Sequence, residues 1–433
     1  MKLAFCSLMF AAVAGFAQNP TFTLNTYPVG AGPFGVAVTD INSNGHPDLI
    51  SANYTAGTLT VLTNNGDGLF NSNATITAGS GPIAIAAADV NDDGKPDLIS
   101  ANNLLNTLTV WTNNGSGIFG SNATLNVGSY PNFVIAADVN GDGKPDLISA
   151  NRGANTLTVL TNNGGGHFEL SATLPVGNTP YGLTAADLSG SGKLDLISAN
   201  YADNTLTVLT NNGSGNFGSN ATLNVGSNPY AVLAVDVNGN GKPALISANY
   251  GDGTLTVLTN NGGGLFSSNA TLTVSGFPDG LAAADMNGDA KIDLISANAR
   301  IFPNAGNLMV FTNNGTGGFG SNTLVTVGQK PYAVATADIN NDGQMDLICA
   351  NQGDSTLTVL TQNGGPKPVL SIAAAGANTL KISWSLPATG YVLQTNGNLA
   401  SVAGWADVSN PTQTNVLNFP VGTGDMFFRL RHP

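Results

Sequence analysis

Short apolar runs separated by polar turn residues fill most of the chain, and they follow the period of β-strands rather than that of helices. In one representative segment, Tyr181–Ala186 and Leu194–Ser198 are short apolar runs, and Thr205–Thr210 alternates apolar and polar residues. Asn211–Gly213 then supplies an Asn-Gly hairpin signal, and Ala221–Val225 forms a fourth run. The pattern predicts four short β-strands and no helix in this segment.

The same segment recurs seven times, each time with the phrase ADVNGDGKPDLISAN or a close variant. The first aspartates of the phrases are Asp40, Asp89, Asp138, Asp187, Asp236, Asp285 and Asp338. Their spacing is 49 residues, except for one interval of 53 that contains an insertion between Asn298 and Leu308. Four strands per repeat of this length predict an all-β, seven-bladed β-propeller. A β-solenoid is the competing interpretation, but its coils would be shorter, at roughly 20–30 residues.

The two ends of the repeat region indicate how the ring closes. The last repeat stops at Gln362–Gly365 without a fourth strand, and Thr21–Val29 aligns with the strand that is missing. An N-terminal strand that completes the seventh blade would leave no unpaired edge there. We therefore predict that Thr21–Val29 closes the propeller.

We divide the chain into a leader over residues 1–17, a propeller over residues 21–365 and a small module over residues 366–433. After residue 368 the repeat ends and the composition changes. Short strands are expected in this module at Val369–Ile372, Leu380–Leu386, Tyr391–Thr395, Val416–Val421 and Phe427–Leu430. They suit a small β-sandwich that resembles immunoglobulin-like or fibronectin-III-like modules, or a passive cap on the propeller.

The leader predicts that the protein is exported. Residues 1–17 contain Lys2, an apolar run and a small-x-small cleavage site at Gly15–Ala17. We therefore expect a secreted or surface-exposed protein. No later apolar stretch is long enough to cross a membrane. Cys6 lies in the leader, which leaves Cys349 as the one thiol of the mature chain, and we expect it to be a buried strand residue.

Composition and charge narrow the classes of partner. The 433 residues carry a net charge of −13 with a pI near 4.3, which argues against nucleic acids and anionic membranes, since both require a basic surface. A single Glu, Glu169, stands against 25 Asp among the 26 acidic residues. Asp is favoured in metal-binding turns and Glu on helices, so this bias agrees with the absence of helices.

Each repeat places the pattern D-x-N-x-D-G-x-x-D between its first and second strands. Oxygen donors at positions 1, 3, 5, 7 and 9, with Gly at position 6 for a sharp turn, are typical of calcium loops. An EF-hand is excluded because no Glu occupies position 12 and no helices flank the loop, and magnesium retains its water too strongly. Bare Asp/Asn/Gly turns are the alternative. Two carboxylates ~4 Å apart repel by about 1 kcal/mol in water and ~4 kcal/mol at an effective dielectric of 20, which favours a bound cation.

We assign as calcium ligands the donors of six loops, with the position-7 residue contributing its backbone oxygen. They are Asp40, Asn42, Asn44, His46, Asp48; Asp89, Asn91, Asp93, Lys95, Asp97; Asp138, Asn140, Asp142, Lys144, Asp146; Asp187, Ser189, Ser191, Lys193, Asp195; Asp285, Asn287, Asp289, Lys291, Asp293; and Asp338, Asn340, Asp342, Gln344, Asp346.

The loops differ in their expected affinity for Ca²⁺, because fewer carboxylates make weaker sites. The loops that begin at Asp89, Asp138 and Asp338 keep every ligand, and the Asp285 loop keeps them too but has Ala290 in place of Gly. The Asp40 loop has two carboxylates, and the Asp187 loop relies on serines. The loop at Asp236 has Ala244 at position 9 and is expected to be empty. Four or five good Ca²⁺ sites are predicted.

These repeats resemble the FG-GAP/VCBS repeats of bacterial secreted proteins, a family whose fold is shared with the head propeller of integrin α-subunits. The resemblance covers about residues 21–365 and rests on the calcium loop followed by DLISAN…NTLTVLTNNGxGxF. The literal FG and GAP motifs are poorly kept, so the bacterial type is the closer one. The resemblance implies calcium in the turns and recognition of extracellular ligands, either sugars or proteins.

The calcium loops and the Asn-Gly hairpins should share one face of the propeller, while the loops of the opposite face vary. Each repeat has a Pro seven residues before its first loop Asp, and the residue after this Pro should lie near the central axis. Aromatic rings combined with Arg and Asp suit stacking on a sugar or gripping a peptide. Alternatively, the aromatic residues only pack the mouth of the channel. Our ligand-binding candidates are Tyr54, Arg152, Tyr181, Tyr201, Tyr230, Tyr250, Asp279, Arg300, Phe302 and Tyr332.

The sequence therefore favours a monomeric, extracellular calcium-binding propeller that recognises a glycan or protein, as in adhesion. A structural scaffold in which calcium only stabilises the fold is one alternative. A polysaccharide-active enzyme that uses Asp203, Asp252, Asp279 or Asp354 is another, but Glu169 stands alone and the three His lie in unrelated contexts, so we assign no catalytic residues.

Overall fold

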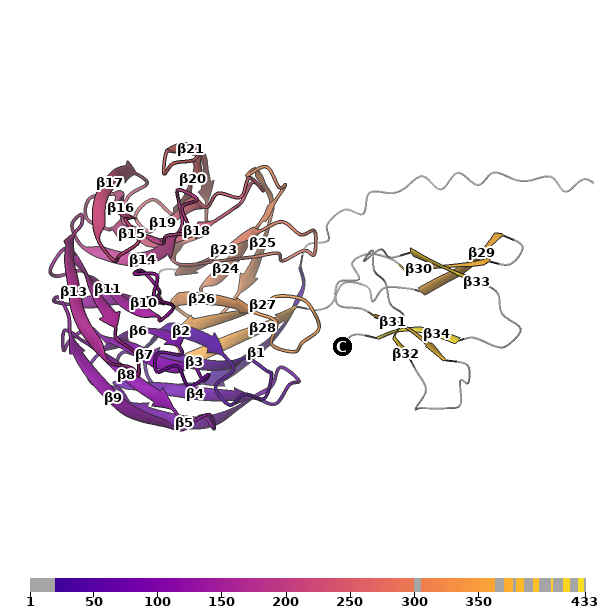
Figure 1. The fold of residues 1–433 in the computed structure, drawn as a ribbon, viewed down its shortest axis with the longest axis horizontal. Coiled ribbons are helices and arrows are strands. Elements are labelled where there is room, and N and C mark those ends of the chain that lie inside the picture. The colour runs from indigo at the N-terminus through magenta and orange to yellow at the C-terminus, as the bar shows by residue number, and fades with distance from the viewer. Residues whose placement is uncertain are drawn as a thin grey trace, which may run out of the picture.

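The computed structural model describes residues 20–299, 305–362 and six strands between residues 370 and 431. The leader over residues 1–17 and two ligand-binding candidates, Arg300 and Phe302, lie outside the described residues. Seven four-stranded antiparallel sheets are arranged around a central axis (Figure 1). The predicted all-β, seven-bladed propeller is confirmed.

Blades one to four contain the following strands. They are β2 (Pro33–Thr39), β3 (Asp48–Asn53), β4 (Thr58–Asn64), β5 (Phe70–Thr77); β6 (Pro82–Ala88), β7 (Asp97–Asn102), β8 (Thr107–Asn113), β9 (Phe119–Asn126); β10 (Pro131–Ala137), β11 (Asp146–Asn151), β12 (Thr156–Asn162), β13 (Phe168–Pro175); and β14 (Pro180–Ala186), β15 (Asp195–Asn200), β16 (Thr205–Asn211), β17 (Phe217–Asn224).

Blades five to seven follow the same order, and the last takes its outer strand from the N-terminus. The strands are β18 (Pro229–Val235), β19 (Ala244–Asn249), β20 (Thr254–Asn260), β21 (Phe266–Thr273); β22 (Phe277–Ala284), β23 (Asp293–Ala299), β24 (Asn307–Asn313), β25 (Phe319–Thr326); and β26 (Pro331–Ala337), β27 (Asp346–Asn351), β28 (Thr356–Gln362), β1 (Phe22–Pro28).

The fourth strand of each complete repeat begins earlier than its apolar pattern indicates. In the fourth blade the pattern predicts Ala221–Val225, whereas β17 begins at Phe217, which pairs with Asn211. A register shift between Val208 and Leu209 lies in the pairing of β16 with this longer strand. The Phe217 ring packs against the core between blades, so it stabilises the extended start of the strand.

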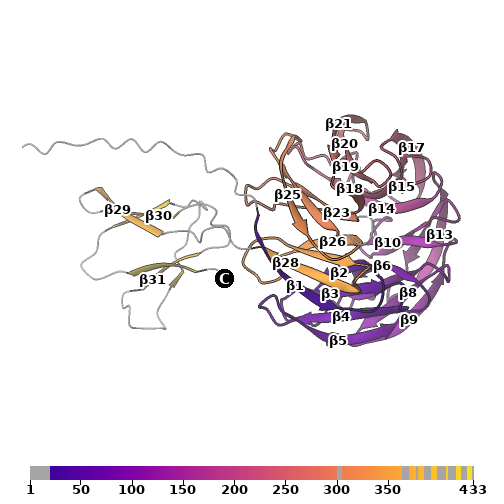
Figure 2. The same ribbon diagram turned by 180° about the vertical axis from the view of Figure 1, so that it is seen from behind.

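The ring closes as the sequence predicts. β1 pairs antiparallel with β28, from Phe22 opposite Gln362 to Pro28 opposite Thr356. The innermost strands contact one another in cyclic order, and β2 of the first blade contacts β26 of the seventh (Figure 2). No blade edge is left open at the junction between the two ends of the propeller.

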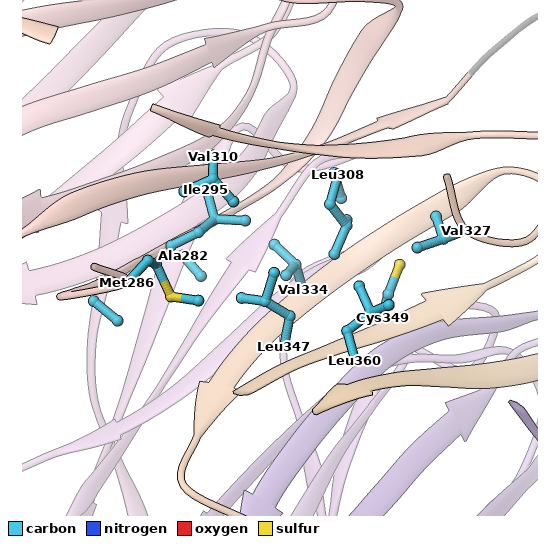
Figure 3. Packing of buried hydrophobic residues seen from close by; sticks show 12 residues of the cluster. Ala282, Met286, Ile295, Leu308, Val310, Val327, Val334, Leu347, Cys349 and Leu360 are labelled. Carbon is cyan, nitrogen blue, oxygen red and sulfur yellow. The ribbon is translucent and has the colours of Figure 1, made fainter. Parts of the chain in front are cut away.

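The hydrophobic core is divided into seven clusters that lie between neighbouring blades. Figure 3 shows the cluster between the sixth and seventh blades, where Met286 and Ile295 face Leu347. Each blade presents apolar side chains on both faces of its middle strands, which is why DLISAN is buried throughout. Cys349 is fully buried in this cluster, as predicted, and burial raises the pKa of its thiol.

The six remaining strands form two antiparallel sheets of three strands. One sheet has the order β29 (Leu370–Gly376), β30 (Thr379–Trp384), β33 (Val416–Pro420), and the other β32 (Ala406–Asp407), β31 (Val392–Asn396), β34 (Phe427–Arg431). In the part of the chain that the structure describes, no helix is long and apolar enough to cross a membrane.

Candidate functional site

The aspartate-rich turns fold around their own backbone N–H groups. In the turn that begins at Asp138, Oδ2 of Asp138 accepts a hydrogen bond from the Gly143 N–H at 2.8 Å. The Asp142 N–H donates both to Asp138 Oδ1, at 3.2 Å, and to Asn140 Oδ1, at 2.9 Å. The Asp142 carboxylate in turn accepts from the Lys144 N–H at 3.0 Å. Side-chain oxygens at positions 1, 3 and 5 are therefore gathered within one turn.

Position 6 of every turn is in the left-handed region, which explains the preference for Gly there. The φ angles are 83° at Gly45, 80° at Gly94, 85° at Gly143, 79° at Gly192, 76° at Gly241 and 84° at Gly343. Ala290 occupies the same conformation with φ of 63°. Because a Cβ is disfavoured there, Ala290 strains the Asp285 turn, whereas the other six turns have Gly at this position.

The aspartate at position 9 is a buried anchor between two turns. Asp146 is fully buried, and its Oδ2 accepts from the Val139 N–H at 3.1 Å while its Oδ1 accepts from the Asn162 N–H of the Asn-Gly hairpin at 2.8 Å. The same pair of bonds holds Asp48, Asp97, Asp293 and Asp346. The calcium-loop pattern in the sequence does not by itself predict that the position-9 Asp joins the turn to the hairpin.

Burial raises the pKa of these position-9 carboxyls, to about 6 for Asp293 and to about 7 for Asp346. The two backbone hydrogen bonds lower the pKa of each, and the carboxylates at positions 1 and 5 of the same turn raise it. Each of these turns therefore places the negative charges of the position-1 and position-5 carboxylates close to the buried carboxyl group at position 9.

Lysines at position 7 balance part of that charge. Lys95 lies 3.6 Å from Asp93, Lys144 lies 3.8 Å from Asp142, and Lys291 lies 3.2 Å from Asp289. The side chains of these pairs are partly exposed to solvent, which screens the attraction, so each pair contributes little to stability. Among the described residues, no group of three or more His, Cys, Asp or Glu side chains could hold a metal ion without other donors. A metal in these turns would therefore depend also on the Asn and backbone oxygens.

A second candidate site lies at the mouth of the central channel. The residue after the Pro that recurs in each repeat lines one cavity with a volume of about 170 Å³, and together these residues form a ring with one member per blade. Its members are Phe34, Ile83, Asn132, Tyr181, Tyr230, Asp279 and Tyr332. In the next position along the first strands, Gly or Ala lines the cavity in every blade except one, where Phe133 does so.

Aromatic side chains from five blades form a continuous cluster at this mouth. Ring centroids are 4.6 Å apart for Tyr181 and Tyr230, 6.1 Å for Tyr230 and Tyr332, and 4.2 Å for Tyr332 and Phe34. The loops after the second strands add three rings, from Tyr54, Tyr201 and Tyr250, and Phe277 stacks on Tyr250 at 5.0 Å. We call these rings the aromatic mouth.

Arg152 borders the aromatic mouth. Its Nη1 donates a hydrogen bond of 2.8 Å to the Tyr181 hydroxyl, and its guanidinium carbon lies 5.6 Å from the centroid of that ring. The guanidinium also lies over the exposed Tyr130 ring, at 5.5 Å. Arg152 therefore presents a positive charge beside Tyr181 that is already oriented by two rings.

Asp279 is the unusual member of the ring. Its side chain is 3% exposed, and neither carboxylate oxygen has a hydrogen-bond partner among the described residues. Burial raises its pKa well above the usual range of Asp. Burial is also the main cause of the raised pKa values of Tyr230 and Tyr332, to which the nearby Asp279 charge adds. The structure thus places an unpaired carboxyl group in the same cavity as the rings of Tyr230 and Tyr332.

The structure brings together most of the ligand-binding residues that the sequence predicts. Tyr54, Tyr201 and Tyr250 from the second-strand loops meet the ring residues, and Arg152 contacts Tyr181. Sequence reasoning missed Phe277, whose position before Pro278 was a usable signal. Asn132 follows one of the recurring prolines and so was expected near the axis, but it was not among the ligand-binding candidates, and its Oδ1 has no hydrogen-bond partner among the described residues.

The other aspartates of this face have backbone partners. Oδ2 of Asp203 accepts from the Asn178 N–H, and Oδ2 of Asp354 accepts from the Gln329 N–H, each at 2.6 Å. Asp252 makes the equivalent bond to the Ser227 N–H. These three carboxylates each brace the loop before the first strand of their own blade.

Comparison with known proteins identifies the repeat. The model of the FG-GAP-like repeat family matches residues 40–100, 89–149, 138–198, 187–247, 236–296 and 285–349. Each match runs from one aspartate-rich turn through the next, so six overlapping matches span all seven turns. No curated protein matches the chain in sequence.

Solved structures share the fold at low sequence identity. Two crystal structures of BBS1N in complex with ARL6DN give TM-scores of 0.56 and 0.57 at 12% identity, and the match covers 80% of this chain and 98% of theirs. A protein from Lactobacillus plantarum gives a TM-score of 0.56 at 14% identity, covering 70% of this chain and 88% of that one.

Proposed function

The chain belongs to the FG-GAP-like repeat family, and we propose that it is an exported recognition module, stabilised by calcium, that binds a glycan or protein at its aromatic mouth. The observation that carries the proposal is the convergence of aromatic rings from five blades, with Arg152 beside them, on one end of the channel. Tyr rings provide flat apolar surfaces with a polar tip, and these suit sugar rings and protein anchors alike.

Two further observations support parts of this proposal. BBS1N, a propeller of similar fold, is found in complex with another protein, ARL6DN, which favours a protein ligand for this chain as well. The leader pattern over residues 1–17 favours action outside the cell.

The donor chemistry of the aspartate-rich turns fits calcium. Asp138 Oδ1 and Asn140 Oδ1 both point at one N–H group, so carboxylate and amide oxygens are already gathered in the turn. Asp142 and the backbone oxygen of Lys144 would complete the inner donors, and Asp146 would anchor the turn to the hairpin. Calcium prefers such oxygen ligands, and when bound it would neutralise the charge that surrounds the buried Asp146.

We assign no catalytic role to the aromatic mouth. Glycosidases use a pair of carboxyl groups on either side of the scissile bond. On this face, Asp203, Asp252 and Asp354 are engaged with backbone N–H groups, which leaves Asp279 without a second free carboxylate among the described residues.

A glycan array, together with a pull-down from extracellular material, tests the recognition proposal. We expect the full-length chain to bind a defined set of ligands and the Tyr201→Ala and Tyr250→Ala variants to lose at least ten-fold in affinity. Leu265→Ala is the matched control, because Leu265 is exposed on a hairpin of the opposite face. Unchanged binding by both Tyr variants would remove the aromatic mouth from the proposal.

A further inference from the structure

The cavity at the mouth contains unpaired hydrogen-bond acceptors. Asp279 and Asn132 both line it, and their side chains are 3% and 5% exposed. Both carboxylate oxygens of Asp279 and Oδ1 of Asn132 have no hydrogen-bond partner among the described residues. Buried polar atoms in native proteins are nearly always paired, so these oxygens indicate that a donor is missing.

The two acceptors lie on blades at nearly opposite sides of the ring. Asn132 belongs to β10 of the third blade and Asp279 to β22 of the sixth. Tyr181 and Tyr230 line the channel between them on one side, and Tyr332 leads on to Phe34 on the other. A group in the cavity would therefore meet acceptors at its ends and aromatic rings around its middle.

The aromatic rings fit a cation near Asp279. Tyr230 and Tyr332 come from the blades on either side of Asp279, and their ring centroids approach to 6.1 Å across the blade that carries it. Ring faces attract cations, and a carboxylate out of water is stable when a cation is beside it. Among the described residues, no Lys, Arg or His forms an ion pair with Asp279.

The missing group must donate hydrogen bonds, carry positive charge and be small. A cavity of ~150 Å³ holds a benzene-sized molecule, so the present volume of about 170 Å³ admits an alkyl group of several heavy atoms. A primary ammonium group has three N–H donors and no acceptor, which complements the unpaired acceptor oxygens of Asp279 and Asn132. A quaternary ammonium group has the charge but no donors.

From this geometry we infer that the cavity binds the primary ammonium group of an alkylamine, held by the Asp279 carboxylate and the neighbouring rings of Tyr230 and Tyr332. The inference rests on the proposed recognition function and names the chemical group that the aromatic mouth takes. The ammonium group could belong to a free alkylamine or to a lysine side chain of a protein ligand, because the two share this chemistry.

Calorimetric titration of the full-length chain at pH 7 tests the inference with n-butylammonium, Nα-acetyl-lysine methylamide and tetramethylammonium. We expect n-butylammonium to bind and Asp279→Asn to weaken its binding about 10- to 100-fold, since a charged hydrogen-bonding partner is lost. Tetramethylammonium should bind at least ten-fold more weakly than n-butylammonium. Asp67→Asn, which removes the same charge from an exposed hairpin, should leave binding unchanged.

Nα-acetyl-lysine methylamide distinguishes a free alkylamine from a lysine side chain as the natural ligand. Binding of both amines supports a lysine side chain as the natural ligand, and binding of n-butylammonium alone supports a free amine. Thermal unfolding shows whether Asp279→Asn remains folded, and a folded variant that binds n-butylammonium as tightly as the wild type would overturn the inference. So would amine binding that appears only after Arg300→Ala, because the chain would then supply the cation itself.

The titration is independent of the glycan array. If the wild type fails to bind n-butylammonium but keeps ligands that depend on Tyr201 and Tyr250, the inference fails and the recognition function stands. If n-butylammonium binds while no glycan or protein does, the broader recognition proposal fails.

Discussion

The Asn64 side chain donates a hydrogen bond of 2.6 Å from Nδ2 to the backbone carbonyl of Ile339. This bond joins the hairpin of the first blade to the aspartate-rich turn of the seventh. Equivalent bonds link each neighbouring pair of blades up to the sixth, from Asn113 to Ile41 through Asn313 to Val237. In the seventh blade Gln362 replaces the Asn, and its Nε2 donates to Gln344 instead.

Asn64→Ala should lower the free energy of unfolding by about 1–3 kcal/mol. The variant leaves the buried Ile339 carbonyl without its Asn64 donor and cuts a link across the junction of the ring. Chemical denaturation provides the measurement. Asn71→Ala, at an exposed position of β5, is the control and should change stability by less than about 0.5 kcal/mol. Equal losses in both variants would contradict a role for this bond.

Gln362→Asn offers the converse change in the same experiment. The shorter amide should reach the Met286 carbonyl, which holds the equivalent position in the sixth blade, and stabilise the protein by about 0.5–1.5 kcal/mol. A destabilised variant would show that the bond between Gln362 and Gln344 matters more.

Ala290→Gly should stabilise the protein by about 0.5–1 kcal/mol, because Gly adopts the left-handed conformation of position 6 without the cost of a Cβ. Calcium affinity of the Asp285 turn should rise together with stability. The matched control is Ala283→Gly in β22, where the same change should destabilise by about 0.5–1 kcal/mol. Stabilisation by the control, or none by Ala290→Gly, would contradict strain as the cause.

Removal of calcium should lower the thermal midpoint. A ligand that binds only the native state stabilises it by about 2.7 kcal/mol per site at 100 times its Kd, so EGTA should destabilise the chain substantially. Calcium titration followed by calorimetry should give four or five strong sites, with Asp142→Asn removing one of them. Asn240→Ala, in the turn that lacks a position-9 Asp, should remove none. An unmoved midpoint in EGTA would mean that these are only turns.

Asp279→Asn should stabilise the ligand-free protein at pH 7 and change it little near pH 4. Between the pKa of an unfolded Asp, about 3.9, and the raised native pKa, the native state keeps the extra proton, so the wild type loses stability as pH rises. The titratable neighbours, Tyr201, Tyr230, Tyr250 and Tyr332, stay neutral in this range because their pKa values are raised.

Denaturation curves at several pH values measure this effect. A gain of about 1 kcal/mol or more at pH 7, falling toward zero at pH 4, is expected for Asp279→Asn. A gain that does not depend on pH would show that Asp279 has the same pKa in the native and unfolded states, and that its removal acts through packing alone.

The repeat made the blades and their closure predictable, because both depend on local patterns that recur at a fixed spacing. The geometry of the aspartate-rich turns was predictable as well, because Gly recurs at position 6, where the backbone is left-handed. Ala290 is the one residue that replaces it. The burial of Asp146 was less accessible, because it arises from Asn162, which lies sixteen residues later and on another turn. The isolation of Asp279 depends on rings from two other blades, and only the closed ring brings them together.

The pairing of β1 with β28 sets the order in which the blades can form during synthesis. Phe22 emerges from the ribosome early, yet its partner Gln362 follows 340 residues later, so β1 waits unpaired through most of synthesis. The first six blades can fold as they are synthesised. The propeller cannot close until β28 has left the ribosome and can pair with β1. A chain stalled before β28 would keep an open seam that proteases can reach, whereas a finished chain conceals it. The propeller can therefore close only after residue 362 has been synthesised.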